Sequence, residues 1–587
     1  MGIDPKDEEK HLEATHRGRM AGLAADKKRI LAMAPENALQ AILEHPTSRA
    51  LVHSMAEEDF FFLINEIGHH DALEVLSLAS NRQWEYILDM DTWHRDRIQL
   101  QSIAYWLNLL HQADPGRFID WTKNEKYDLL EYFLYKTAQI VVREQDEDPS
   151  DLADGFFTCD DVYYIRFSDD VLDVLADLGD EEEREEIVDF LYTMIRRLAD
   201  EDHMAYQLML LRAATVNPGE SEEEAYHFRN VRLAEKGFLP FDEAAGVYAP
   251  LKPSAVRKGP HKGIGSAPEM DFTVPVPINH AFMLKNDTLF GKALNIIDVE
   301  PVLNELQVEF ASLCNRIIAA DQDVIKGKEQ LKAVVGKACG YLGIGIQRLA
   351  GTKTPPDASM GASIICNYQL TDIFRTGYAM VLALKQRALK WRRQSWFAQK
   401  NLALTFWGEY LVGHIGGLLL KHPKYFDNYE TGVLYREFAS IADIRKARKA
   451  LNEAMIFDRI LSLMDIDTSG FPGQRLIMCH VVLLTLWAKH RIGIPLHNRP
   501  EPIPVEAFRP FFASLWDSGE NTGRIKDAAK TDFLEWLSAS TGLTVPEISR
   551  QASVFLETLF NDIESELATV DPKDLDHRFV NLFLLKK

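Results

Sequence analysis

Residues 57–91 read EEDFFFLINEIGHHDALEVLSLASNRQWEYILDMD, and this stretch decides the fold class. Its apolar side chains recur at positions i, i+3, i+4 and i+7, once at Phe60, Leu63, Ile64 and Ile67 and again at Ala72, Val75, Leu76 and Ala79. That spacing places one apolar stripe along each of two short amphipathic helices. Residues 103–110 repeat the pattern, which predicts a third helix.

Residues that cap helix N-termini stand where such helices should begin. Ser54 is followed by Glu57, and Ser80 by a glutamine at the same spacing, as in a capping box where two side chains satisfy each other's free amides. Asp114 precedes Pro115, and proline is tolerated at the first helical position because its missing N–H is not needed there. We therefore expect helices to start just after Ser54, Ser80 and Asp114.

Short helices of this kind cannot bury their apolar stripes alone, and in repeat proteins they stack against one another. We expect an all-α, predominantly helical chain with an N-terminal repeat-like helical array, from residue 28 to about 140, and a C-terminal helical domain. The strands should be few and short, with candidates at residues 163–167, 272–278 and 363–368.

The 587 residues exceed the roughly 250 to 300 at which single cores stop growing, so several domains are expected. Prolines and glycines alternate between residues 248 and 279, which predicts a linker or an extended crossover, and a second proline-rich break covers residues 495–510. The expected segments are a flexible N-terminal segment (1–27), an acidic helical array (28–248), the linker or crossover (249–284), a helical domain (285–500) and a C-terminal helical unit (501–587).

The acidic charge is concentrated in the first half of the chain. Residues 1–250 contain 24 Lys and Arg against 52 Asp and Glu, whereas the remainder contains 41 against 36, and the net charge is −23. This balance makes nucleic acid an unfavourable partner, since phosphate binding depends on basic side chains. The asymmetry instead favours a protein partner that docks on the acidic half.

The sequence predicts neither a secretory signal nor a membrane span. Residues 1–27 carry charges throughout and lack an apolar core. The most apolar stretches, 406–420 and 476–487, are shorter than the about 20 residues that a span needs and contain Glu409, His414 and His480, so we expect buried core helices. The five cysteines form no CxxC pair, which is typical of reduced thiols in a cytoplasmic protein.

Three runs carry a family resemblance: residues 57–64, 79–88 and 155–164, which read EEDFFFLI, ASNRQWEYIL and GFFTCDDVYY. They resemble a bacterial family known only as a domain of unknown function, along most of the chain, and this resemblance implies no activity. Residues 28–110 are also similar to the acidic helical array at the cytosolic end of MgtE-type magnesium channels. Those channels add a CBS pair and a membrane domain, neither of which this sequence shows, so the similarity does not imply transport.

Clustered carboxylates make residues 144–202 a candidate site for a divalent cation. This stretch contains 22 acidic and four basic residues and includes the run Asp180, Glu181, Glu182 and Glu183. Carboxylate oxygens are the ligands that Mg²⁺ and Ca²⁺ prefer. A solvated helix face is the alternative, because acidic faces are ordinary on helices.

Asp465, Asp467 and Ser469 occupy positions 1, 3 and 5 of a half-matched calcium loop, with Gly470 at the sixth position. Leu476 stands at the twelfth position, where a bidentate glutamate should close the site. The alternative is a structural turn that caps the next helix.

One basic segment, residues 385–393, carries lysines and arginines beside Trp391. On a helix these charges do not form one face but surround a buried stripe, which consists of Ile373, Gly377, Met380, Leu384, Ala388 and Trp391. A structural role is therefore favoured over nucleic-acid binding.

Two pairs of glycines stand four residues apart on expected helices, Gly336 with Gly340 and Gly413 with Gly417. They match neither a dinucleotide-binding nor a phosphate-binding loop. We expect them to allow close packing.

No catalytic motif stands in a supporting context, and the sequence does not indicate a cofactor. Catalytic groups can converge from distant segments, however, and residues 285–500 bring together Glu409, His414 and His480 as candidate pocket residues. Our leading hypothesis is a cytoplasmic scaffold or regulatory protein that docks a protein partner through its acidic half. The second is an enzyme or divalent-cation-responsive protein with a pocket in residues 285–500, which a deep pocket with converging ionisable groups would favour.

Overall fold

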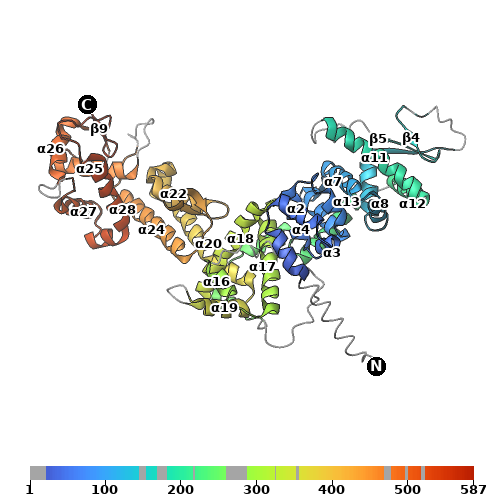
Figure 1. Cartoon of the computed structure of the whole chain (residues 1–587). Helices are drawn as coiled ribbons and strands as arrows, with labels where there is room; N and C mark the ends of the chain where they lie inside the picture. Colours follow the sequence, from blue (N-terminus) through green and yellow to red (C-terminus); the bar gives the residue numbers. More distant parts are fainter. Residues whose placement is uncertain are drawn as a thin grey trace, which may run out of the picture. The chain divides into compact units, whose positions relative to one another are not determined.

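The computed structural model describes residues 22–94, 96–144, 152, 154–167, 181–215, 218–259, 280, 287–323, 325–351, 356–468, 478–495, 500–516 and 523–587. The chain forms two compact units, whose elements Figure 1 colours in chain order. Unit 1 comprises Met1–Ala249, Val256–Cys339 and Pro355–Ile373, and unit 2 comprises Pro250–Ala255, Gly340–Thr354 and Phe374–Lys587. The five predicted segments divide the chain more finely, and their boundaries stay predictions.

Unit 1 begins with short helices: α2 (Pro35–Leu43), α3 (Ser48–His53), α4 (Glu57–Ile67), α5 (Leu73–Leu78), α6 (Asn81–Asp91), α7 (Leu100–Ala113), α8 (Pro115–Asn124) and α9 (Tyr127–Thr137). The two-residue strands β1 (Trp93–His94) and β2 (Arg97–Ile98) form a hairpin between α6 and α7. Helices two apart in sequence pack together, α2 on α4, α3 on α5, α4 on α6 and α5 on α7. Each short helix thereby buries its stripe, and the interpretation as a helical repeat stays a prediction.

Two of the predicted helix starts are confirmed by their capping hydrogen bonds. At α6, the Ser80 hydroxyl accepts a hydrogen bond from the Gln83 N–H, and the Gln83 side chain accepts one from the Ser80 N–H. At α8, the Asp114 carboxylate accepts a hydrogen bond from the Arg117 N–H. These caps satisfy amides that the first turn of a helix leaves without partners.

A three-stranded antiparallel sheet follows, with β5 (Tyr163–Phe167) between β3 (Ala138–Val142) and β4 (Phe157–Thr158). Strand β5 coincides with the predicted strand 163–167. Helices α11 (Glu181–Glu201), α12 (His203–Thr215) and α13 (Pro218–Glu235) come next. Helix α12 packs against α9, α11 and β3, which ties the sheet to the helical array.

Cationic residues from later in unit 1 pair with carboxylates of the array. Arg232 of α13 donates two hydrogen bonds to Asp89, of 2.7 and 2.8 Å, and the Asp89 side chain is nearly buried. Further ion pairs join Lys236 to Glu58, Lys326 to Asp91 and Lys328 to Glu66. Part of the acidic charge of the first half is therefore neutralised within unit 1.

The rest of unit 1 contains α14 (Phe241–Ala244), η2 (Ala245–Tyr248), α16 (Leu289–Leu294), α17 (Glu300–Asp321) and α19 (Ala358–Asn367). Helix α17 packs on α14 and η2, and α16 packs on α19. The strand predicted at residues 363–368 was wrong, because this stretch lies in α19 up to Asn367. The strand predicted at 272–278 and most of the predicted linker lie outside the described residues.

Helices α18 (Lys328–Ala350) and α20 (Leu370–Gln394) each continue from unit 1 into unit 2. Unit 2 further contains η3 (Pro253–Ala255), α21 (Trp396–Gln399), η4 (Leu404–Trp407), α22 (Glu409–Leu419), β6 (Tyr425–Asp427), α23 (Asn428–Thr431), β7 (Val433–Arg436), α24 (Ile441–Leu463), α25 (Cys479–Ile492), β8 (Ile503–Pro504), α26 (Val505–Leu515), α27 (Asp527–Thr541), α28 (Val545–Leu567) and β9 (Leu585–Lys586). Helix α24 packs against both α22 and α28. The final strand β9 pairs in parallel with β8, so the C-terminal segment returns to the body of unit 2.

The basic segment of α20 has most of the predicted buried stripe, since five of its six residues are buried and Met380 is half-buried. The Lys385 ammonium donates hydrogen bonds of 2.6 and 2.7 Å to the carbonyl oxygens of Leu420 and Lys421, just after α22 ends. A cation in this place complements the partial negative charge of a helix C-terminus.

The predicted all-α class is confirmed, because helices dominate the described residues and the strands are two to five residues long. The apolar stretches 406–420 and 476–487 lie largely in η4, α22 and α25, as buried helices. No helix in the described part of the chain has the length and hydropathy needed to cross a bilayer.

Candidate functional site

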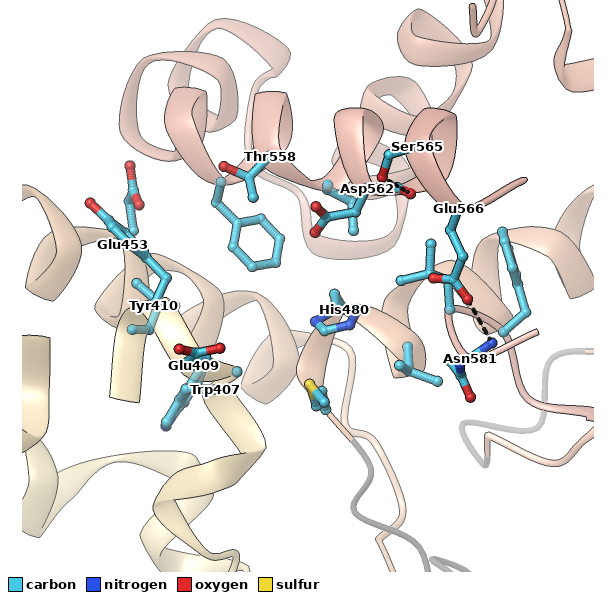
Figure 2. Close-up of a pocket in the computed structure, with 18 of the residues that line it drawn as sticks. Trp407, Glu409, Tyr410, Glu453, His480, Thr558, Asp562, Ser565, Glu566 and Asn581 are labelled. Carbon is cyan, nitrogen blue, oxygen red and sulfur yellow. Dashed lines mark hydrogen bonds between the residues drawn. The ribbon is translucent and has the colours of Figure 1, made fainter. Parts of the chain in front are cut away.

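A pocket of about 710 Å³ lies in unit 2 (Figure 2). Its walls come from residues 407–411 around the start of α22, from 478, 480 and 481 around the start of α25, from one face of α28, and from 580–584 in the C-terminal segment. Tyr429 of α23 and Glu453 of α24 complete the lining. Segments far apart in the sequence therefore build one cavity.

Helix α28 supplies a regular row of side chains to the pocket: Phe555, Thr558, Leu559, Asp562, Ser565 and Glu566. Residues three and four apart lie on one face of a helix, so this row follows about 16 Å of α28 at 1.5 Å per residue. Its first part is mostly apolar and its last part is acidic. The Glu566 carboxylate accepts a hydrogen bond of 3.2 Å from the Asn581 N–H, which ties the acidic end to the C-terminal segment.

Gly408 shapes the wall at the start of α22. Its φ of +80° lies in the region that favours glycine, and this turn leads the chain from η4 directly into α22. Glu409 thereby stands in the first turn of the helix, where its carboxylate accepts a hydrogen bond of 3.4 Å from the Asn428 side chain. Figure 2 shows Glu409 and Glu453 on one side of the pocket.

His480 lies in the first turn of α25, between those carboxylates and the acidic end of α28 (Figure 2). Burial lowers the pKa of its imidazole to about 4, so the ring is neutral near pH 7. A neutral imidazole can accept a proton or a hydrogen bond at one nitrogen and donate at the other. His480 is thus an uncharged hydrogen-bonding group within the cavity.

Burial also changes the pKa values of other ionisable groups in the pocket. It raises the pKa of Asp562, and burial together with the charge of Glu453 raises the pKa of Tyr410 to about 12. Tyr410 therefore keeps its proton and can donate a hydrogen bond to a ligand. Within the described lining, four carboxylates and one histidine are present, and no Lys or Arg is found.

Two of the three candidate pocket residues, Glu409 and His480, line this cavity. His414 does not line its described wall. It lies one turn further along α22, 4.9 Å from Tyr410 between ring centroids, and burial lowers its pKa to about 4. The part that any of the three takes in binding or catalysis stays a prediction.

The candidate metal ligands do not come together in the described residues. Asp465 and Asp467 are exposed beyond the end of α24, and Ser469 lies outside the described residues. Asp180 also lies outside them, while Glu181, Glu182 and Glu183 begin α11 with side chains that are not described. In the described part of the chain, no group of three or more His, Cys, Asp or Glu is arranged to hold a metal ion. A divalent-cation site stays a prediction.

The sequence reasoning missed Asp562, Glu566 and Asn581, because it placed residues 501–587 in a separate unit. The pocket crosses the boundary predicted at residue 500. The row of Thr558, Asp562 and Glu566 at spacings of four was a visible signal of one polar helix face. That signal alone does not show which segments lie opposite the face.

Comparison with known proteins finds one family. The model of a family of unknown function (DUF6178) matches residues 17–586. No curated protein matches the chain, and no solved structure does. The similarity to the helical array of MgtE-type channels is therefore not confirmed.

Proposed function

The chain belongs to the family of unknown function DUF6178, which brings no activity with it, and from the geometry alone we propose that unit 2 binds a small molecule in the pocket around His480. The observation that carries this proposal is one cavity in which ionisable groups from five helices converge. A deep pocket with converging ionisable groups is the feature that we expected to favour our second sequence hypothesis, an enzyme or divalent-cation-responsive protein.

The size and lining of the pocket support binding. Sites for small molecules measure about 300 to 1,000 Å³ and combine apolar walls with a few polar groups that orient the ligand. Here Phe555, Leu559 and Phe583 supply apolar surface, and the polar groups include Tyr410 and His480. Groups with perturbed pKa values in a cleft also mark functional sites.

The same groups supply acid–base chemistry if the bound molecule is a substrate. His480 is neutral near pH 7, and its lowered pKa makes it a weaker base than an exposed histidine. Asp562, whose pKa is raised by burial, is better able to hold a proton than an exposed aspartate. These two residues are our candidates for proton transfer in this pocket.

Filling the pocket tests the proposal. Thr558 is exposed on α28 and lines the cavity, so Thr558→Trp should occupy space there without disturbing the core. We expect a fragment library, screened by ligand-observed NMR, to contain fragments that bind the full-length wild-type chain. Some of these fragments should give no binding signal with Thr558→Trp. The control Glu557→Gln changes an exposed neighbour that does not line the described cavity. If Thr558→Trp melts like the wild type and every fragment that binds the wild type still binds this variant, the proposal is overturned.

A second candidate function is docking of a protein partner on the acidic half. Helix α12 exposes the apolar stripe Met204, Leu208 and Leu211, at 76%, 48% and 45%. Apolar stripes exposed on a helix are typical of interaction surfaces. The net negative charge of residues 1–250 favours a partner with a basic rim around an apolar centre.

Replacing this stripe with serines tests docking. A partner that co-purifies from the native cell should be lost from Met204→Ser/Leu208→Ser/Leu211→Ser but kept by Ala214→Ser, a change at an exposed alanine of α12. Its association should also slow as salt rises, because exposed charges are screened beyond about 8 Å at physiological ionic strength. A partner equally bound by both variants excludes this surface. A cytoplasmic location belongs to the same proposal and agrees with five cysteines that form no disulfide.

A further inference from the structure

The charges that line the pocket indicate the class of ligand, an inference that rests on the small-molecule binding proposed above. Glu409, Glu453, Asp562 and Glu566 are all acidic, and the described lining contains no Lys or Arg. A ligand charge close to a carboxylate interacts with it more strongly at a protein surface than in bulk water. A negative ligand would meet several such repulsions, and a positive ligand would gain the same interactions.

The end of α28 adds to the negative potential. Asp562 and Glu566 lie in its last two turns, and the helix ends at Leu567 with no basic residue in its last turn. The backbone dipoles of a helix place about half a negative charge at its C-terminus. Backbone and side chains at this end of the pocket therefore both favour a cation.

Two helix N-termini border the same pocket and favour the opposite charge. They belong to α22 and α25, and each carries about half a positive charge from its backbone. Glu409 stands in the first turn of α22 and already supplies the negative group which that end favours. His480 in the first turn of α25 is neutral near pH 7 and adds no positive charge. The four carboxylates outweigh the two helix ends.

The remaining lining suits the organic part of such a ligand. Trp407, Tyr429, Phe555 and Phe583 present aromatic rings, which bury apolar groups and attract cations over their faces. The Trp407 indole N–H is buried and has no hydrogen-bond partner among the described residues.

We propose that the pocket binds an organic cation, an ammonium or guanidinium group on an apolar or aromatic body, with the charged group against Asp562 and Glu566. The body would lie along the first part of the α28 row, beside Phe555 and Leu559. Figure 2 shows the acidic groups on two sides of the cavity, so a second cationic group on the ligand would meet Glu409 and Glu453.

The test uses full-length protein and a library of matched fragments, in which the same body carries an amine, an alcohol or a carboxylate. Among fragments that no longer bind Thr558→Trp, amines should bind the wild type more tightly than their matched alcohols and carboxylates do. The variant Asp562→Asn/Glu566→Gln keeps the shape of both side chains and removes their charge. It should weaken the amines by about tenfold or more, the effect of losing a charged hydrogen-bond partner, and change the alcohols little. The control Glu557→Gln removes a charge from the same helix outside the described lining.

The outcomes separate this inference from the proposed function. If the fragments that bind in the pocket are mainly carboxylates or alcohols, the cation class is overturned and small-molecule binding still holds. The same conclusion follows if the amines bind Asp562→Asn/Glu566→Gln as tightly as the wild type. A library in which no binder responds to Thr558→Trp overturns both. A melting temperature that rises with Mg²⁺ or Ca²⁺ alone, and only while Asp562 and Glu566 are charged, would make the site a metal site and overturn the organic cation.

Discussion

His414 and His480 stand in apolar helices, and burial lowers the pKa of each to about 4 from a usual value near 6.5. Between these two pH values the unfolded chain binds protons that the folded chain does not, so the histidines cost no stability above pH 6.5 and destabilise increasingly below it. We expect the free energy of unfolding of unit 2 to fall by about 1.4 kcal/mol per pH unit for each histidine as pH drops from 6 to 5. Urea unfolding at a series of pH values measures this slope.

The comparison that isolates one histidine is His480→Gln, which should remove about half of the slope. His227→Gln, at an exposed position on α13, should leave it unchanged. A slope that persists in His414→Gln/His480→Gln would show that other groups control the acid response.

Asp89 holds a cluster of arginines at the edge of the array. Its carboxylate accepts two hydrogen bonds from Arg232, and its carbonyl oxygen accepts one of 2.7 Å from Arg229. Asp89→Asn removes this charge from two guanidinium groups that are not fully buried, and Arg232 keeps an ion pair of 3.2 Å with Glu85, so we expect a loss of about 1 to 3 kcal/mol in unfolding free energy. The exposed pair of Asp26 and Arg29 is the control, and Asp26→Asn should change little.

At the scale of helices, glycines decide where segments approach closely. Gly377 of α20 lies so near α18 that an added Cβ would be 2.1 Å from the Tyr341 carbonyl oxygen. Gly377→Ala must push the two helices apart, and we expect it to cost about 1 to 3 kcal/mol. Gly336 of α18 is exposed with nothing within 4 Å of its Cβ position, so Gly336→Ala should stabilise by about 0.5 to 1 kcal/mol. Chemical unfolding measures the change in unfolding free energy of each variant. A lower unfolding free energy in both variants would contradict this packing.

The glycine pattern in the sequence predicted close packing, and three of the four positions have it. A Cβ at Gly340 would lie 2.5 Å from the Phe438 carbonyl oxygen, one at Gly413 2.5 Å from the Phe426 ring, and one at Gly417 2.5 Å from the Lys424 carbonyl oxygen. Gly336 was predicted wrongly. Spacing along a helix shows which glycines share a face but not whether another segment covers that face.

Capping residues show a similar limit. Ser80 and Asp114 cap helices as predicted, but Ser54 does not cap α4. Helix α3 continues to His53, and the Ser54 hydroxyl donates a hydrogen bond to the Leu51 carbonyl oxygen at the end of that helix. The same serine chemistry fits either end of a helix, so sequence alone did not decide between them.

The wrong strand at residues 363–368 has a local cause. Its short apolar run is compatible with a strand or with a buried helix, and periodicity cannot separate the two. Asp357 decides the outcome from outside the run, because its carboxylate accepts a hydrogen bond from the Met360 N–H and starts α19. Helical class was predictable from repeated stripes, while single short elements depended on such neighbours.

At the scale of the whole molecule, the pocket was half predictable. Glu409 and His480 attracted attention because ionisable side chains are unusual in apolar helices. Asp562 and Glu566 did not, because they lie on an amphipathic helix where acidic residues are common. Only the packing of α28 against α24 and the return of the C-terminal segment to unit 2 bring them to the same cavity.

The predicted boundary at residue 248 can be tested by truncation, because unit 1 draws on residues far beyond it. Helix α17 covers α14 and η2, and the Tyr248 hydroxyl donates a hydrogen bond of 2.7 Å to Asp321. A fragment of residues 22–248 would lose this cover, which shields Ala244 and Val247, now 1% and 3% exposed. We therefore expect it to melt at a lower temperature than a fragment of residues 22–373.

The loss of ion pairs should also lower the melting temperature of the shorter fragment. Lys326 and Lys328 pair with Asp91 and Glu66 at 2.5 Å, and the shorter fragment keeps the two carboxylates without these cations. Repulsion among the remaining acids would rise, and added salt should recover part of the difference by screening it. Circular-dichroism melts of both fragments at low and high salt measure the two effects. If residues 22–248 melt as high as the longer fragment, the boundary at 248 is a true domain boundary, and the contacts with α17 and α18 contribute little to the stability of the array.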